Sequence, residues 1–130
     1  MIVDTSAIVA ILREEPEARS FSTKLHMERP TCMSAANYLE AGIVIDGGRD
    51  AVASARLDIV LDRLSVEILP VTPSQARLAR QAYRDFGRGS GHPAKLNFGD
   101  CFAYALAMER GEALLYKGDD FIHAGLARVV

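Results

Sequence analysis

The sequence is poor in the side chains that bind soft metals or carry redox chemistry: its 130 residues include two cysteines, three histidines and no tryptophan. Cys32 and Cys101 have no partner at the spacings typical of zinc or redox sites, which excludes both classes and predicts buried free thiols. His26, His92 and His123 are isolated in the sequence. We therefore assign no catalytic or metal-binding role to a histidine.

Long hydrophobic runs are also absent. The longest apolar stretches, such as residues 41–45, are far too short to span a bilayer, which takes about 20 residues. Residues 1–15 have no basic lead-in and carry Asp4 early, so they do not resemble a signal peptide. We expect a cytoplasmic protein that does not associate with membranes.

Neither sign of charge dominates, since 15 Lys and Arg residues against 17 Asp and Glu residues give a formal net charge of −2. This balance argues against a protein that coats nucleic acid by bulk electrostatics, although a local basic face or a bound cation can attract phosphates. The composition, 49% hydrophobic and 25% charged, is that of an ordinary globular protein. The length predicts a single domain over residues 1–130.

Segments typical of strands and of helices alternate along the chain. Strands are expected at residues 1–3, 31–33, 66–71 and 113–116, with a further edge strand at 127–130. Helices are expected at residues 6–12, 14–28, 35–46, 49–64, 73–86 and 98–110. Ser34, Thr72 and Asn97 are placed as helix caps, and Gln75 is placed for a capping box. The alternation predicts an α/β fold with a central parallel sheet flanked by helices on both faces.

Acidic residues follow two of the expected strands. Asp4 comes directly after the first strand, and Asp119, with Asp120 beside it, follows the apolar stretch that begins at residue 114. Each of them alone is consistent with an ordinary turn residue. Because ligands of open parallel sheets bind beyond the carboxyl ends of the strands, the positions together suggest one site.

Two further acids lie within apolar helical segments. Glu40 is in the middle of a helix that is apolar around most of its circumference, so the helix is expected to be largely buried. Glu40 is then either buried with it or on a solvated edge. Asp100 stands in the first turn of its helix, where it either complements the helix dipole or meets a cation. Removing a carboxylate from water is costly unless something pairs with it, so a partner is expected for Asp100.

Carboxylates that converge in a cleft repel one another, and they either take up protons or hold cations. Oxygen ligands without histidine or cysteine select Mg²⁺ or Mn²⁺ rather than zinc. The chemistry that follows is metal-assisted hydrolysis of a phosphodiester. Thr5 and Ser6, next to Asp4, either orient the attacking water or a bound carboxylate, or cap the first helix.

Four motifs carry a family resemblance. The chain has V-D-T-S after its first strand, then a helical Y-L-E, then N-F-G-D-C-F-A-Y-A-L-A and L-L-Y-K-G-D-D-F. In these motifs, in their order and spacing over nearly the whole chain, the sequence resembles PIN-domain toxins of the VapC type. The last two motifs are the most specific to a VapC subgroup.

The resemblance implies a Mg²⁺-dependent endoribonuclease, with Mn²⁺ as a substitute, that cuts structured RNA such as tRNA or rRNA and inhibits translation. It also implies a homodimer neutralised by a VapB-like antitoxin. By motif match, the acidic catalytic positions are Asp4, Glu40, Asp100 and Asp119. Asp4 and Asp100 are expected to be direct metal ligands, and the other acids, including Asp120, would complete or support the site.

The last motif leaves two alternatives open. Asp119 and Asp120 are adjacent, and we favour Asp119 because Asp120 and Phe121 are typical of a helix start. The subgroup often has a Thr-Asp pair after this phenylalanine, whereas residues 123–126 contain no acid. Either one or two metal ions are therefore compatible with the sequence.

Residues 77–95 are the most basic local segment, with five Arg or Lys residues against one acid. Its four arginines are spaced to lie along one stripe of a helix, and the lysine follows in a glycine-rich loop. Such a stripe either tracks an RNA backbone or is a plain solvated face. The candidate RNA-binding residues are Arg77, Arg80, Arg84, Arg88 and Lys95.

Three rival classes share some of these features. A phosphotransfer receiver needs a phosphoacceptor aspartate after a middle strand, and residues 69–73 offer none. A haloacid-dehalogenase-like phosphatase needs a second aspartate two residues after Asp4, where Ser6 stands. The stronger alternative is a PIN scaffold that binds RNA or a partner protein without cutting, which metal binding and turnover distinguish from an enzyme.

Overall fold

The structure is a computed structural model that describes residues 1–126, so the edge strand expected at 127–130 lies outside the described residues. The strands are β1 (Ile2–Val3), β2 (Thr31–Ser34), β3 (Val66–Leu69) and β4 (Leu114–Leu115). The helices are α1 (Thr5–Leu12), α2 (Ala18–Met27), α3 (Ala35–Asp46), α4 (Ala51–Arg63), α5 (Pro73–Phe86), α6 (Phe98–Arg110) and α7 (Asp120–His123). Each strand and helix expected between residues 1 and 116 is present; α3, α5 and α6 have the expected bounds, and those of the other elements are shifted. The largest shift is at α2, because Glu14 has a φ of +53° within a turn after α1.

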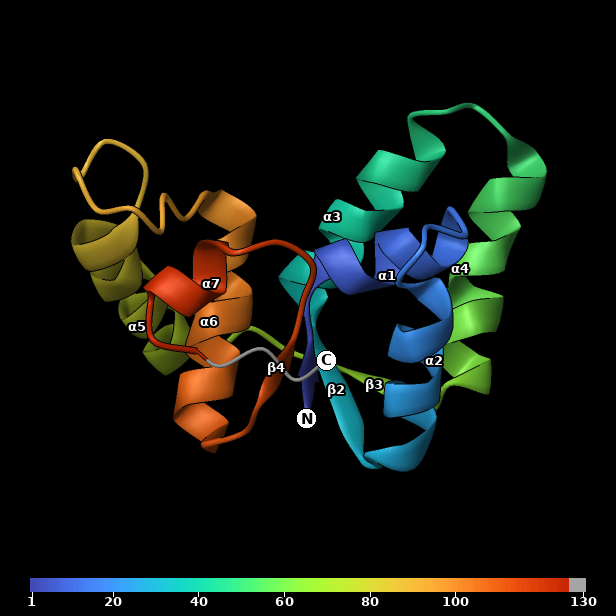
Figure 1. Cartoon of the computed structure of the whole chain (residues 1–130), viewed down its shortest axis with the longest axis horizontal. Coiled ribbons are helices and arrows are strands. Elements are labelled where there is room, and N and C mark those ends of the chain that lie inside the picture. The colour runs from blue at the N-terminus through green and yellow to red at the C-terminus, as the bar shows by residue number, and fades with distance from the viewer. Residues whose placement is uncertain (127–130) are drawn as a thin grey trace.

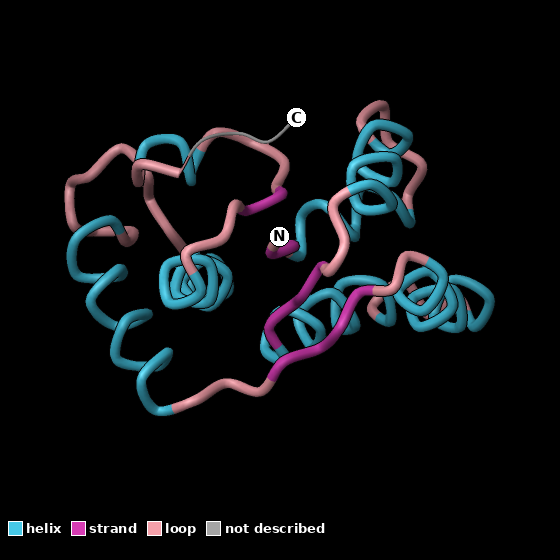
Figure 2. Tube along the Cα trace, turned by 90° about the horizontal axis from the view of Figure 1, so that it is seen from below, coloured by secondary structure: helices cyan, strands magenta, loops and turns pink. Residues whose placement is uncertain are grey.

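The four strands form one parallel sheet in the order β3-β2-β1-β4, and Figure 2 shows it between two groups of helices. β1 is an inner strand, in which Ile2 pairs with Cys32 of β2 and with Leu114 of β4. Since all strands run the same way, their carboxyl ends meet at one edge, where Asp4 follows β1. The predicted α/β class is confirmed.

Successive residues of the strands face opposite sides of the sheet, so the sheet divides the interior into two cores. Ile2 of β1 belongs to the core beneath α5, α6 and α7. Its neighbour Val3 belongs to the core beneath α1, α2, α3 and α4. Figure 1 shows these two groups of helices on either side of the strands. The predicted cover of helices on both faces is therefore present.

Side chains cap the helices at the predicted positions. Ser34 Oγ accepts from the main chain of α3 at 3.2 Å, Thr72 Oγ1 accepts from α5 at 3.2 Å, and Asn97 Oδ1 accepts from α6 at 2.9 Å. The capping-box prediction for Gln75 was wrong. Its Nε2 instead donates to Glu109 Oε2 of α6 at 2.8 Å, because α5 packs against α6.

The expectation that α3 is buried around most of its circumference was wrong. Only one side of this helix is buried, at Asn37, Ala41 and Ile45. On its other side Leu39 is 61% exposed and Ile43 is 63% exposed. α3 therefore has more apolar side chains than the core of this chain buries.

Cys32 and Cys101 are buried and free, as predicted. Within residues 1–126, no helix combines the length and the apolar character that crossing a bilayer requires.

Candidate functional site

Asp4 sits where β1 ends and α1 begins. Its N–H donates to the Leu115 carbonyl of β4 at 2.9 Å, and its Oδ2 caps α1 by accepting from Ser6 N at 3.0 Å. The residue is only 3% exposed, and its Oδ1 is buried without a hydrogen-bond partner among the described residues. An unpaired buried carboxylate oxygen is costly, so this position favours either a proton or a bound cation.

Asp100 lies in the first turn of α6 and forms a reciprocal capping box with Asn97. Asn97 Oδ1 accepts from the Asp100 N–H, and Asp100 Oδ2 accepts from the Asn97 N–H, both at 2.9 Å. This arrangement explains why an aspartate opens an otherwise apolar helix. One carboxylate oxygen closes the helix end, and the carboxylate itself is half-buried.

Burial raises the pKa of two of the acids, Asp4 and Asp100, and the charges of nearby acids add to the rise. Burial raises the pKa of Asp4 to about 7, and the negative charges of Asp100 and Glu40 add to the rise. Burial likewise raises the pKa of Asp100 to about 6, with further contributions from Asp120 and Glu40, while Arg88 acts in the opposite direction. Acids at the end of β1 and on α3, α6 and α7 therefore act on one region at the carboxyl edge of the sheet.

Glu40 is held against the first turn of α6. Asn37, one turn before it on α3, donates from Nδ2 to the Gly99 carbonyl at 2.9 Å and to Glu40 Oε1 at 3.4 Å. A Cβ at Gly99 would lie 1.8 Å from Glu40 Oε2, so only glycine allows this approach. Glu40 thus lies beside the residue that precedes Asp100.

Asn37 and Gly99 are the two residues of this region that the sequence interpretation missed. Asn37 is fully buried, and its main-chain carbonyl also accepts from Thr5 Oγ1 of α1 at 3.1 Å. An asparagine one turn before Glu40 and a glycine next to Asp100 were the available signals. Neither signal specifies a contact between α3 and α6, because that contact depends on tertiary packing.

Thr5 and Ser6 connect the end of β1 to neighbouring elements. The side chain that caps α1 is Asp4, so the alternative in which Thr5 or Ser6 caps that helix was wrong. Ser6 Oγ accepts from the Lys117 N–H at 2.9 Å, and Lys117 Nζ forms an ion pair with Glu17 at 3.3 Å. The segment after β4 is thereby tied to the start of α1 and to the turn before α2.

Asp119 and Asp120 are both exposed and stand at the start of α7. Asp119 is the residue before the helix, and Asp120 is its first residue. The charge of Asp120 contributes to the raised pKa of Asp100, so Asp120 lies within electrostatic reach of the acidic region.

The donor chemistry of this region fits a hard divalent cation. Within the described residues, no three His, Cys, Asp or Glu side chains stand close enough together to enclose an ion by themselves. Mg²⁺ does not require such an enclosure, since it usually keeps several waters and takes one or two carboxylates plus substrate phosphates. Asp4 Oδ1 is a buried oxygen without a hydrogen-bond partner among the described residues, and the charges of Asp100 and Glu40 lie near it.

The basic segment divides into two parts. Arg77, Arg80 and Arg84 are exposed on α5, whereas Gln75 and Ala79 of the same helix are buried. The predicted stripe ends at Arg84, because α5 stops at Phe86 and Gly87 is extended.

Arg88 and Lys95 belong to the loop between α5 and α6, and both are exposed. The expectation that Arg88 continues the helical stripe was therefore wrong. Its positive charge nevertheless opposes the rise in the pKa of Asp100, so Arg88 lies within electrostatic reach of the acids.

Comparisons with known proteins show the family to which this chain belongs. The PIN domain family model matches residues 1–126. The chain is 56% identical to ribonuclease VapC28 of Mycobacterium tuberculosis over 130 residues. The matched region covers 100% of this chain and 98% of the relative. The crystal structure of Mycobacterium tuberculosis VapC20, a sarcin-ricin loop cleaving toxin, has a TM-score of 0.76 at 19% identity and covers 98% of this chain and 97% of that chain. A toxin-antitoxin complex from Klebsiella pneumoniae has a TM-score of 0.68 at 18% identity, over 92% of this chain and 88% of that chain.

The two solved structures are similar in fold at low sequence identity. The family model and the 56% identical relative, by contrast, extend over essentially the whole chain, from the strand before Asp4 to the helix after Asp119. The chain therefore belongs to the PIN domain family and is a VapC-type member of it.

Proposed function

We propose that this chain is a metal-dependent endoribonuclease that hydrolyses phosphodiester bonds of structured RNA, such as tRNA or rRNA, and thereby inhibits translation. The observation that supports it most is the unpaired buried Oδ1 of Asp4 beside the charges of Asp100 and Glu40. A site of this kind repels additional anions unless a cation is bound, and RNA phosphates are anions. The 56% identity to a ribonuclease supports the same activity.

In this proposal Asp4 and Asp100 are the direct ligands of Mg²⁺, which Mn²⁺ replaces. When bound, the ion would lower the pKa of a water and stabilise the leaving oxygen. Glu40 completes the negative charge of the site, and its contact with Gly99 keeps the carboxylate next to Asp100. Thr5 and Ser6 support Asp4 by joining α1 to α3 and to the segment after β4.

We propose that either Asp119 or Asp120 completes the site, and asparagine variants of the two residues distinguish these alternatives. The sequence favours Asp119, whereas the effect of Asp120 on the pKa of Asp100 supports Asp120. We expect Asp120→Asn to reduce cleavage about tenfold or more, the range for residues that support a metal ligand, and Asp119→Asn to have a smaller effect. Cleavage rates of the two variants at equal metal concentration test this, and the reverse order would assign the role to Asp119.

The basic residues Arg77, Arg80, Arg84, Arg88 and Lys95 are proposed to bind the RNA backbone. Replacing Arg80 and Arg84 by alanine is expected to weaken RNA binding at low salt and to reduce the slope of log Kd against log salt by about two, one for each lost phosphate contact. Fluorescence anisotropy with labelled total tRNA in EDTA measures both effects.

The control for the arginine pair is Arg19→Ala with Arg63→Ala, since these exposed arginines lie on α2 and α4, across the sheet from α5. An unchanged salt slope in the Arg80 and Arg84 variant would make α5 a plain solvated face.

The partners follow from the same proposal. A VapB-like antitoxin is proposed to neutralise the activity, which is supported by the VapC relatives and by the fold shared with a toxin-antitoxin complex. A homodimer and a cytoplasmic location, where RNA and ribosomes are found, are proposed on the family resemblance. Light scattering of the purified chain tests the dimer directly.

Cleavage of total cellular RNA by the purified chain, free of antitoxin, tests the proposed function. Discrete fragments are expected with Mg²⁺ or Mn²⁺ and none with EDTA. A folded chain that yields no metal-dependent fragment from total RNA would favour the PIN scaffold that binds RNA or a protein without cutting it.

A further inference from the structure

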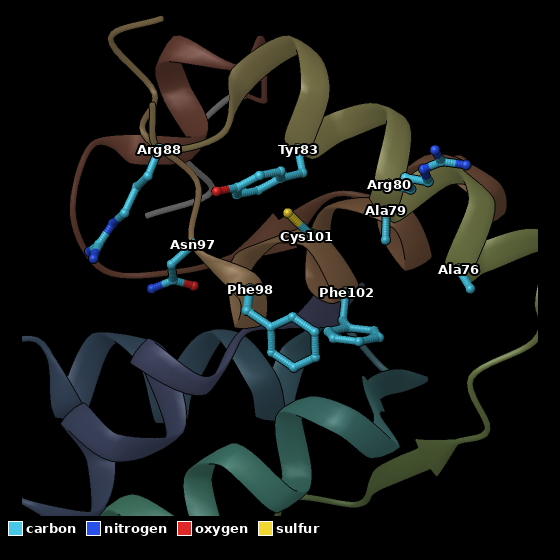
Figure 3. Close-up of a pocket in the computed structure, with 9 residues that line it drawn as sticks. All are labelled: Ala76, Ala79, Arg80, Tyr83, Arg88, Asn97, Phe98, Cys101 and Phe102. Atoms are coloured by element: carbon cyan, nitrogen blue, oxygen red, sulfur yellow. The ribbon is translucent and has the colours of Figure 1, made fainter. Parts of the chain in front are cut away.

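A groove lies between α5 and α6, beside the acidic region but separate from it. Its volume is about 670 Å³, within the range of roughly 300–1,000 Å³ that is typical of small-ligand pockets. Figure 3 shows the floor of the groove between the two helices, with Cys101 at its centre. The residues that line it are Ala76, Ala79, Arg80, Tyr83, Arg88, Asn97, Phe98, Cys101 and Phe102.

Aromatic rings form the two walls of the groove. Tyr83 projects from α5 on one side, and Phe98 and Phe102 project from α6 on the other (Figure 3). Phe98 is 79% exposed and Tyr83 is 47% exposed, so both present ring surface to a ligand. Phe98 is braced by Phe102, whose ring lies at a centroid distance of 4.9 Å and an interplanar angle of 84°. The two rings of α6 therefore pack edge to face at this wall of the groove.

Positive charge marks the two ends of the groove. Arg88 stands with Asn97 at one end, and Arg80 stands with Ala76 at the other (Figure 3). Within the described residues, neither arginine forms an ion pair. The effect of Arg88 on the pKa of Asp100 places its end of the groove next to the acids.

We propose that this groove binds one unpaired nucleobase of RNA next to the phosphate that is cut, with flanking phosphates at Arg80 and Arg88. The proposal rests on the proposed ribonuclease function, because it takes RNA as the ligand. Proteins recognise single-stranded RNA by stacking splayed bases on aromatic rings and by pairing arginine with the backbone. The groove is apolar, has aromatic walls and has an arginine at each end. A base between two phosphates matches these features better than an apolar protein helix would, because the helix offers no negative charge to the arginines.

Binding of ribonucleoside 5′-monophosphates, compared with ribose 5-phosphate, tests this proposal. The isotope-labelled wild-type chain is titrated in EDTA, so that no cleavage occurs, and followed by NMR. We expect the four nucleotides to shift the methyl resonances of Ala76 and Ala79, and ribose 5-phosphate to leave them in place because it has no base to stack. Ala53, on α4 beyond the sheet, should not shift with any of these probes.

Variants of Phe98 make the test specific. Phe98→Ala is expected to weaken nucleotide binding at least about fivefold, since stacking of one base on one ring accounts for that much or more. Phe98→Tyr keeps the ring and should retain the affinity. Met108→Ala, on the last turns of the same helix and half-exposed, is the control that should bind as the wild type does.

Two results would overturn the proposal. If ribose 5-phosphate shifts Ala76 and Ala79 as strongly as the nucleotides do, the groove binds phosphate only. If no probe shifts these residues, the groove does not bind a base, and conversion of a dimer to a monomer by Phe98→Ala would then identify it as an interface between copies of the chain. Neither result depends on cleavage, so a failure of the proposed ribonuclease function, seen as absent metal-dependent fragments, stays distinguishable.

Discussion

Asp4→Asn is expected to reduce RNA cleavage by more than about 100-fold, a larger loss than residues outside the metal ligands usually cause. Asparagine keeps the oxygen that accepts from Ser6 N, so the cap of α1 is retained. What the variant loses is the negative charge at the buried, unpaired Oδ1. Cleavage rates at saturating Mg²⁺ measure the effect.

The same variant is expected to be more stable than the wild type at pH 8 in EDTA. Burial raises the pKa of Asp4 from 3.8 to about 7, so between these values the folded state holds a proton that the unfolded state has released. The folding stability of the wild type therefore falls as the pH rises through this range. Asparagine does not titrate, and we expect Asp4→Asn to gain about 2–4 kcal/mol at pH 8 and nothing below pH 4.

Urea unfolding between pH 4 and pH 8 checks this prediction. Asp50→Asn is the matched control, because Asp50 caps α4 in the same way but is exposed. It should leave both cleavage and the pH dependence of stability close to those of the wild type. Wild-type cleavage by Asp4→Asn would remove Asp4 from the site.

Gly99→Ala is expected to impair cleavage about 100-fold while changing the free energy of unfolding by less than about 1 kcal/mol. The added Cβ would lie 1.8 Å from Glu40 Oε2, so the Glu40 carboxylate must move. The displaced atoms are the end of a flexible side chain, and alanine favours the helix, so the fold tolerates the change. A catalytic group displaced by about 1 Å costs on the order of 100-fold in rate.

Gly42→Ala is the matched control for this prediction. Gly42 also lies within a helix, α3, but a Cβ there would meet only Leu57 Cδ2 at 3.8 Å, an ordinary contact. Cleavage rates and urea unfolding of both variants give the comparison. Full activity of Gly99→Ala would show that the position of Glu40 beside Asp100 is not needed for cleavage.

The order of strands and helices was predictable because it depends on short-range features of the sequence, such as helix caps and hydrophobic patterns. Ser34, Thr72 and Asn97 cap helices through bonds to residues two or three positions on, so their roles depend on short-range chemistry. The family resemblance likewise rests on short motifs around Asp4 and Asp100. Both kinds of signal can be read without knowing how distant elements pack.

Features that depend on packing between distant elements were not predictable in this way. Glu40 was a candidate from its apolar surroundings, yet its support by Asn37 and Gly99 joins α3 to α6 across the fold. The burial of α3 was overestimated, because the composition of a helix does not say how much of it a neighbour covers. Arg88 was placed on the helical stripe by its spacing alone, although the expected helix, like α5, ends at Phe86.

Binding of Mn²⁺, measured by electron paramagnetic resonance of the free ion, tests most directly the claim that these acids hold a divalent cation. We predict saturable binding to the wild-type chain, competition by Mg²⁺, and loss of binding in Asp4→Asn, while Asp50→Asn binds as the wild type does. Equal binding of Mn²⁺ by the wild type and by Asp4→Asn would contradict the account, because the unpaired oxygen at the end of β1 would then hold no ion.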